Sequence, residues 1–112
     1  MGLFDFLKKD KVKKADINDV VANMKNEKNA LLVDVREPEE YKIVHIPGSV
    51  SMPLSTLSEK IKGIRNKDTH VYVYCASGIR SEKGVKAFVE AGFTNVTDAG
   101  GIYDYNGPLK AR

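Results

Sequence analysis

The chain has 112 residues, 42% hydrophobic and 29% charged, a size and balance typical of one compact globular domain. Its single cysteine excludes an internal disulfide, and with only two histidines beside it a zinc site is not expected. No apolar run approaches the roughly 18 residues of a membrane span, and the N-terminus lacks the order of a signal peptide. We therefore expect a cytoplasmic protein that uses neither a metal nor a cofactor.

The net charge of +3 is concentrated at the N-terminus, where residues 1–14 hold five lysines and two aspartates. The remaining chain is neutral, so a basic surface for nucleic acid is not predicted. We interpret residues 1–14 as a basic and apolar arm and residues 15–112 as the domain. The apolar part of the arm is shorter than typical interfacial helices, so we expect it to pack on the domain rather than bind a membrane.

A helix is predicted after Asp16, a good N-cap, because the apolar residues that follow repeat at helical spacing. These residues are Ile17, Val20, Val21 and Met24. An apolar run interrupted only by Asp34 predicts a buried strand, and Pro38 suits the first position of a short helix or turn. The elements predicted in this part of the chain are the strand at 31–35, the helix or turn at 37–41, a turn at 46–48 and a short strand at 49–52.

The second half continues the alternation of helices and strands. Its predicted elements are a helix with its apolar face at Leu54, Leu57, Ile61 and Ile64, a strand at 71–74, a helix at 81–91 ended by Gly92, a strand at 95–97 and a final turn opened by Gly100 and Gly101. This order predicts an α/β fold, a mainly parallel central sheet flanked by helices on both faces. Ligands of such sheets lie beyond the carboxyl ends of the strands, where Cys75 follows the clearest strand.

The loop after Cys75 has the composition of an anion-binding loop. Its residues, in order, are Ala76, Ser77, Gly78, Ile79 and Arg80. Small residues allow the backbone to curl, Gly78 can adopt a positive φ, and a curled loop turns its N–H groups inward. The following helix adds its positive N-terminal end, and Arg80 adds a cation. These features favour a nucleophilic thiolate, so we predict Cys75 as the catalytic residue and residues 76–80 as its binding loop.

The spacing of Cys75 and Arg80 indicates which anion the loop holds. The two residues have C-x4-R spacing, whereas cysteine phosphatases have C-x5-R spacing in a longer loop that holds a phosphate. A shorter loop has less room and suits a single sulfur atom. The alternatives are a small, inert, buried cysteine, a cysteine phosphatase or arsenate reductase, and a non-enzymatic binding or sensing module on the same fold.

Four segments together resemble the single-domain rhodanese family. They are Val33–Tyr41, His45–Ser49, the Cys75–Ser81 loop and Gly100–Ile102, and they span about residues 15–108. The resemblance implies a rhodanese fold and a sulfurtransferase activity. Cys75 would take sulfane sulfur from thiosulfate or a low-molecular-weight persulfide, carry it as a persulfide, and pass it to cyanide or to a thiol or protein acceptor. The amides of residues 76–80 would cradle the sulfur, and Arg80 would help to bind an anionic donor.

The chain departs from the family pattern at three positions. Ala76 stands where many members have Arg or Lys, Val44 where a Gly is frequent, and Tyr105 near a frequent Trp of the last helix. The change at position 76 removes one cation that would attract thiosulfate.

Three other polar residues are interpreted as structural: Asp34, Arg36 and His45. Asp34 and Arg36 are expected to pair and to order the loop after their strand, because an aspartate in an apolar strand needs a partner. The alternative is a catalytic role for the two residues. For His45 the alternative is a general base, but its place in a turn element favours a structural role. Lys83 and Lys86 either raise the local potential for anionic donors or form a plain solvated helix face.

Overall fold

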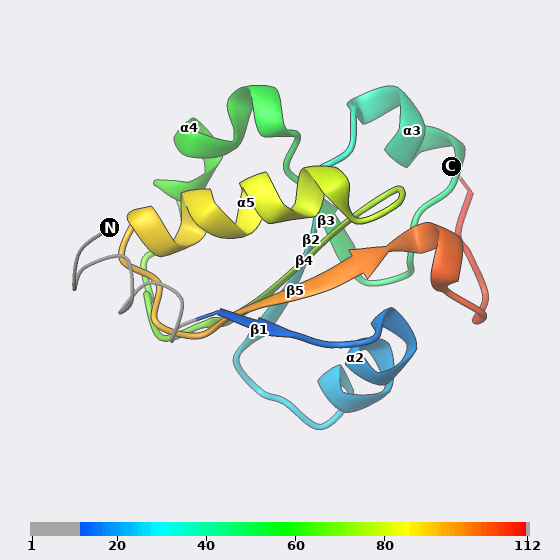
Figure 1. Cartoon of the computed structure of the whole chain (residues 1–112), viewed down its shortest axis with the longest axis horizontal. Helices are drawn as coiled ribbons and strands as arrows, with labels where there is room; N and C mark the ends of the chain where they lie inside the picture. The colour runs from blue at the N-terminus through cyan, green and yellow to red at the C-terminus, as the bar shows by residue number, and fades with distance from the viewer. Residues whose placement is uncertain (1–11, 112) are drawn as a thin grey trace.

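The computed structural model describes residues 12–111, which form a five-stranded sheet (Figure 1). The strands are β1 (Val12–Lys14), β2 (Ala30–Asp34), β3 (Ser49–Ser51), β4 (His70–Cys75) and β5 (Val96–Gly101). Their order across the sheet is β1-β5-β4-β2-β3, and every neighbouring pair is parallel. The mainly parallel sheet predicted from the alternation of elements is therefore confirmed. Strand β4 lies at its centre.

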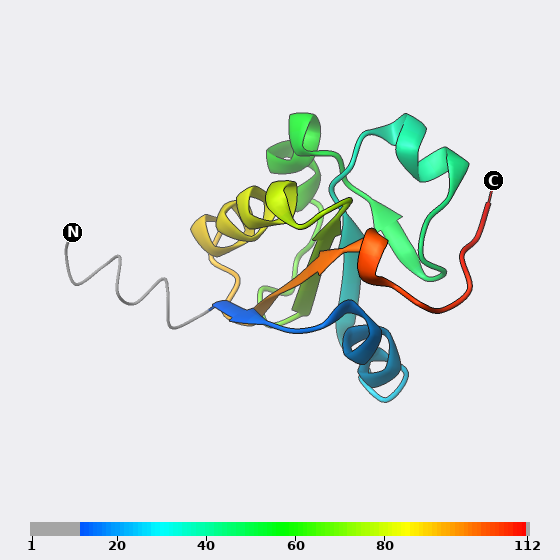
Figure 2. The ribbon, with the colours of Figure 1, turned by 45° about the vertical axis from the view of Figure 1, so that its right-hand side comes forward.

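Helices cover both faces of this sheet, as predicted (Figure 2). Helix α2 (Ile17–Met24) packs on one face, and α4 (Leu57–Ile61) and α5 (Ile79–Glu90) lie over the other. Helix α3 (Pro38–Ile43) and two short 3-10 helices, η1 (Leu54–Thr56) and η2 (Ile102–Asp104), complete the fold. The side chain of Asp16 accepts a hydrogen bond from the amide of Asn18, which confirms it as the N-cap of α2.

The hydrophobic core is divided by the sheet into two clusters. The α4 and α5 side includes Val33, Val73, Val85, Phe88 and Phe93, all buried. The α2 side includes Ile17, Val20, Leu32, Tyr72 and Tyr74. Alternate residues of β2 and β4 supply both clusters, which explains why these strands are apolar along most of their length. A core on both faces holds β4, and with it the position of Cys75, in a fixed place.

Strand β1 was not predicted. Its residues Val12–Lys14, assigned from sequence to the arm, pair with Val96–Asp98 of β5 at one edge of the sheet. Three residues of which two are lysines show no alternation of apolar and polar side chains, so the sequence does not predict a strand there. The strand is recognised only from its pairing with β5. The predicted packing of residues 1–11 lies outside the described part of the chain.

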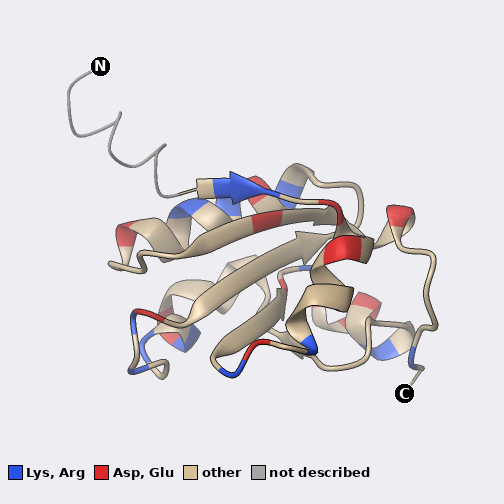
Figure 3. Cartoon of the chain, turned by 90° about the horizontal axis from the view of Figure 1, so that it is seen from below, with Lys and Arg blue, Asp and Glu red and all other residues tan. Residues whose placement is uncertain are grey.

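The end of the chain also differs from its prediction. Gly100 and Gly101 were expected to open the final turn, but they are the last residues of β5, after a register shift against β4. The residues that follow, Ile102–Asp104, form the short 3-10 helix η2. Within residues 12–111, no helix is long and apolar enough to cross a membrane. In Figure 3 the positions of basic residues and those of acidic residues are interspersed along the ribbon.

Candidate active site

Cys75 is the last residue of β4, at the carboxyl edge of the central strand. Its loop lies at the end of the sheet where α3 and η2 also lie (Figure 1). The residue exposes 1% of its surface, and its Sγ accepts a hydrogen bond from the amide of Gly78 at 3.0 Å. Gly78 has a φ of 106°, the positive value predicted for it. The loop therefore curls back so that an amide points at the sulfur.

The residues between Cys75 and Arg80 have different surroundings. Ala76 is buried, and Ser77 and Ile79 are exposed. Gly78 is the N-cap of α5, so the positive end of a 12-residue helix begins directly beside the sulfur. The amide of Gly78 and this helix end are both suited to stabilise a negative charge on sulfur.

Strand β5 and η2 hold the loop in place through hydrogen bonds. The amide of Tyr103 donates to the carbonyl oxygen of Ala76 at 3.1 Å. Ser81 Oγ donates to Asp98 Oδ1 at 2.8 Å, and the amide of Gly100 donates to the same oxygen at 3.0 Å. Asp98 was not predicted as a support of the loop. The signal that could have found it is a charged residue directly after a predicted strand, two residues before a pair of glycines. An aspartate in that place needs buried hydrogen-bond partners.

Arg80 lies in a bidentate ion pair with Glu40 of α3. Nη1 is 2.7 Å from Oε1, and Nη2 is 3.0 Å from Oε2. Hydrogen bonds from Arg80 outweigh the effect of partial burial and lower the pKa of Glu40 from 4.5 to about 2. The hydrogen bond to Glu40 likewise raises the pKa of Arg80 and outweighs the effect of its partial burial. The guanidinium that sequence analysis assigned to donor binding therefore already has a carboxylate partner, which sequence analysis did not foresee.

Asp34 and Arg36 form the predicted structural pair. Arg36 Nη2 is 2.7 Å from Asp34 Oδ2 and 2.7 Å from the carbonyl oxygen of Val44, and both side chains of the pair are buried. Burial opposes the charge on Arg36, but the hydrogen bonds to Asp34 outweigh burial and raise its pKa. The pair ties the end of β2 to the segment that follows α3, which supports its assigned structural role.

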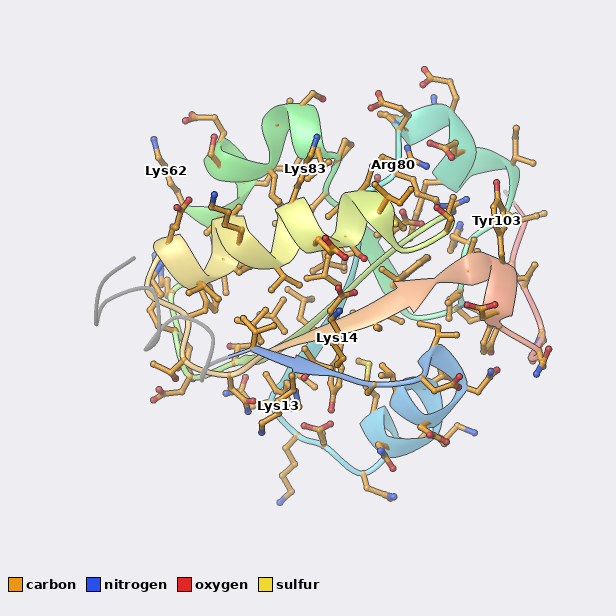
Figure 4. All side chains as sticks on the ribbon, viewed as in Figure 1. Lys13, Lys14, Lys62, Arg80, Lys83 and Tyr103 are labelled. Carbon is orange, nitrogen blue, oxygen red and sulfur yellow. The ribbon has the colours of Figure 1, made fainter. Side chains whose placement is uncertain are left out.

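His45 is part of the same framework. Its ring stacks on Tyr41 with centroids 3.8 Å apart, and its Nδ1 is 2.8 Å from the carbonyl oxygen of Tyr41. Its backbone pairs with Lys110 in an isolated bridge. These contacts agree with a structural role for His45. Lys83 and Lys86 are exposed on α5, and Figure 4 shows Lys83 and Arg80 on this same helix.

The chain is similar to known proteins both in sequence and in fold. Residues 17–107 match the family described as Rhodanese-like domain. Thiosulfate sulfurtransferase PspE of Escherichia coli is 37% identical over 73 residues, which cover 64% of this chain and 70% of PspE. A solved structure of a rhodanese with anions from E. coli superposes with a TM-score of 0.68 at 33% identity, covering 74% of this chain and 99% of that one.

The same kind of domain also occurs in longer proteins with another named activity. A tRNA uridine(34) hydroxylase of Buchnera aphidicola is 38% identical over 93 residues. That alignment covers 76% of this chain but 29% of the hydroxylase. The shared domain therefore identifies a fold and a kind of site, while the activity has to be argued from the residues of the site.

Proposed function

Since the chain belongs to the rhodanese-like domain family, we propose that it is a sulfurtransferase in which Cys75 carries a sulfane sulfur as a persulfide. The observation that carries the proposal is the hydrogen bond from the Gly78 amide to Cys75 Sγ, 3.0 Å long, at the start of α5. A donor amide and a helix N-terminus stabilise an anionic sulfur, whether it is a thiolate or the outer atom of a persulfide. A reducing compartment such as the cytosol suits this chemistry.

The first step loads the sulfur. The Cys75 thiolate attacks the outer sulfur of the donor, a new S–S bond forms, and the donor's own bond to that sulfur breaks. The leaving group is sulfite when the donor is thiosulfate and a thiolate when the donor is an organic persulfide. In both cases the leaving group keeps the electron pair of the broken bond. Before the attack the Gly78 amide already donates to Cys75 Sγ, so the thiolate is held in place as the nucleophile.

The second step returns the enzyme to its thiolate. Cyanide or an external thiolate attacks the outer sulfur of the Cys75 persulfide, and the Cys75 thiolate leaves with the electron pair. The acceptor must come from outside because Cys75 is the single cysteine of the chain. Loading and release of this kind give ping-pong kinetics. The name of PspE, thiosulfate sulfurtransferase, supports thiosulfate as one candidate donor.

Intact-mass measurement tests the proposal. After incubation with thiosulfate and removal of small molecules, the protein is expected to gain the mass of one sulfur atom, and cyanide is expected to remove it. The Cys75→Ser variant is expected to gain nothing. An equal gain of sulfur by Cys75→Ser would overturn the assignment of Cys75.

A further inference from the structure

Glu40 is held in place from two sides. It is the third residue of α3, and its Oε1 accepts a hydrogen bond from the amide of Glu37 at 2.9 Å as half of a capping box. The same carboxylate pairs with both terminal nitrogens of Arg80. The carboxylate is therefore fixed by its own helix and presented to Arg80, which belongs to α5 across the site.

This pair removes most of the positive charge from the loop. Between Cys75 and Arg80 the sequence holds a single cation, Arg80 itself, because position 76 is Ala. With a pKa of about 2, Glu40 is ionised at neutral pH, so the pair has no net charge. Beside this neutral pair, the amide of Gly78 and the N-terminal end of α5 still attract an anionic donor.

Apolar side chains lie around the same loop. Ile79, directly before Arg80, is 72% exposed, and Tyr103, whose amide binds the loop carbonyl of Ala76, is 77% exposed. Figure 4 shows Arg80 and Tyr103 at the same end of the molecule. Exposed apolar groups beside a neutral ion pair suit the carbon part of an organic donor better than a small dianion.

We propose that Glu40 is a positioning residue that sets the choice of donor: by neutralising Arg80 it favours an organic persulfide over thiosulfate. This inference rests on the proposed function. The favoured step is the attack of the Cys75 thiolate on the outer sulfur of R–S–SH. The S–S bond to Cys75 forms, the bond to the R–S group breaks, and R–S⁻ leaves with the electron pair while the proton stays with the transferred sulfur.

The first test measures the charge around Cys75 without any sulfur transfer. Iodoacetate is an anion and iodoacetamide is neutral, and both alkylate the single cysteine, so the ratio of their rates reports the local potential. Glu40→Gln keeps an oxygen for the Glu37 amide and removes the charge. We expect it to raise the iodoacetate-to-iodoacetamide ratio about fivefold. Glu39→Gln, an exposed neighbour on α3, removes the same charge and is expected to leave the ratio unchanged.

The second test measures donor preference. In Glu40→Gln, kcat/KM for thiosulfate is expected to rise about fivefold, chiefly through a lower KM. The comparison donor is hydroxyethyl persulfide, which is generated in the assay and has no charge on its carbon part. For this donor, kcat/KM of Glu40→Gln is expected to stay within about twofold of the parental value. Glu39→Gln is expected to match the parent with both donors.

The outcomes separate this inference from the proposed function. If Cys75 accepts sulfur but Glu40→Gln changes neither the alkylation ratio nor the KM for thiosulfate, the role of Glu40 is wrong and the sulfurtransferase assignment stands. If no variant accepts sulfur from either donor, the sulfurtransferase assignment is wrong, and the donor role of Glu40 falls with it.

Discussion

Gly101 lies directly against Ala76, so closely that a Cβ on Gly101 would overlap the carbonyl oxygen of Ala76 and lie 2.8 Å from its carbonyl carbon. Only glycine permits β5 to approach the loop after Cys75 at this distance. Since the amide of Tyr103 in η2 binds the same carbonyl, the position of the loop depends on the end of β5 and on η2, which follows it.

Gly101→Ala is therefore expected to displace the loop. We predict a loss of about 1–3 kcal/mol in the free energy of unfolding and a fall in sulfurtransferase activity of the folded protein. Urea unfolding and initial rates measure the two effects. Gly63→Ala is the control, because a Cβ there would lie 3.4 Å from its nearest neighbour, the carbonyl oxygen of Lys60. Full activity in Gly101→Ala would show that the loop does not need this contact.

Gly78→Ala separates backbone strain from the contact with sulfur. At a φ of 106°, an added Cβ costs about 1–2 kcal/mol and moves the amide that binds Cys75 Sγ. Gly48→Ala is the matched control, since Gly48 has a φ of 87° and nothing within 4 Å of an added Cβ. We expect similar losses of stability in the two variants and slower alkylation by iodoacetamide only in Gly78→Ala. Equal alkylation rates would argue against a role of the Gly78 amide.

The Glu40–Arg80 pair predicts a dependence of stability on acid pH. Folding lowers the pKa of Glu40 from 4.5 to about 2, because the carboxylate accepts hydrogen bonds from Arg80. A lowered pKa stabilises the folded state fully above pH 4.5, and this contribution is lost as the pH falls from 4.5 to about 2. Glu40→Gln is expected to show a flatter dependence of the unfolding free energy on pH in this window. A slope equal to that of the parent would contradict the pairing.

Asp34→Asn tests whether Asp34 acts in structure or in catalysis. The substitution leaves the buried guanidinium of Arg36 without its counter-charge, which we expect to cost about 3–5 kcal/mol. Unfolding in urea measures this cost, and rates corrected for the folded fraction are expected to stay near those of the parent. An Asp34→Asn protein with parental stability and little activity would instead indicate a catalytic carboxylate.

Much of the fold was predictable because its signals are local. The apolar spacing after Asp16 predicted α2, and the β-branched and aromatic run at 71–74 predicted the central strand. The loop after Cys75 was equally predictable. Its glycine and the helix that follows lie next to each other in the sequence, and its short length can be counted there. The positive φ of Gly78 and its hydrogen bond to sulfur follow from that composition.

The partners of the loop were not predictable because they lie far away in the chain. Glu40 precedes Arg80 by 40 residues, and Ser81 meets Asp98 at a separation of 17. A single sequence does not reveal which carboxylate reaches which cation, so Arg80 was assigned to the donor alone. Strand β1 is a similar case, since three residues with two lysines become a strand only through pairing with β5.

The most direct test of the account locates the transferred sulfur. The protein is loaded with a sulfane donor, alkylated, digested and analysed by tandem mass spectrometry, with part of the loaded sample first treated with cyanide. The account predicts an alkylated persulfide on the peptide that contains Cys75, and its loss with stoichiometric thiocyanate in the cyanide-treated sample. If the protein transfers sulfur to cyanide but no persulfide is found on the peptide that contains Cys75, the assignment of Cys75 as the sulfur carrier is contradicted.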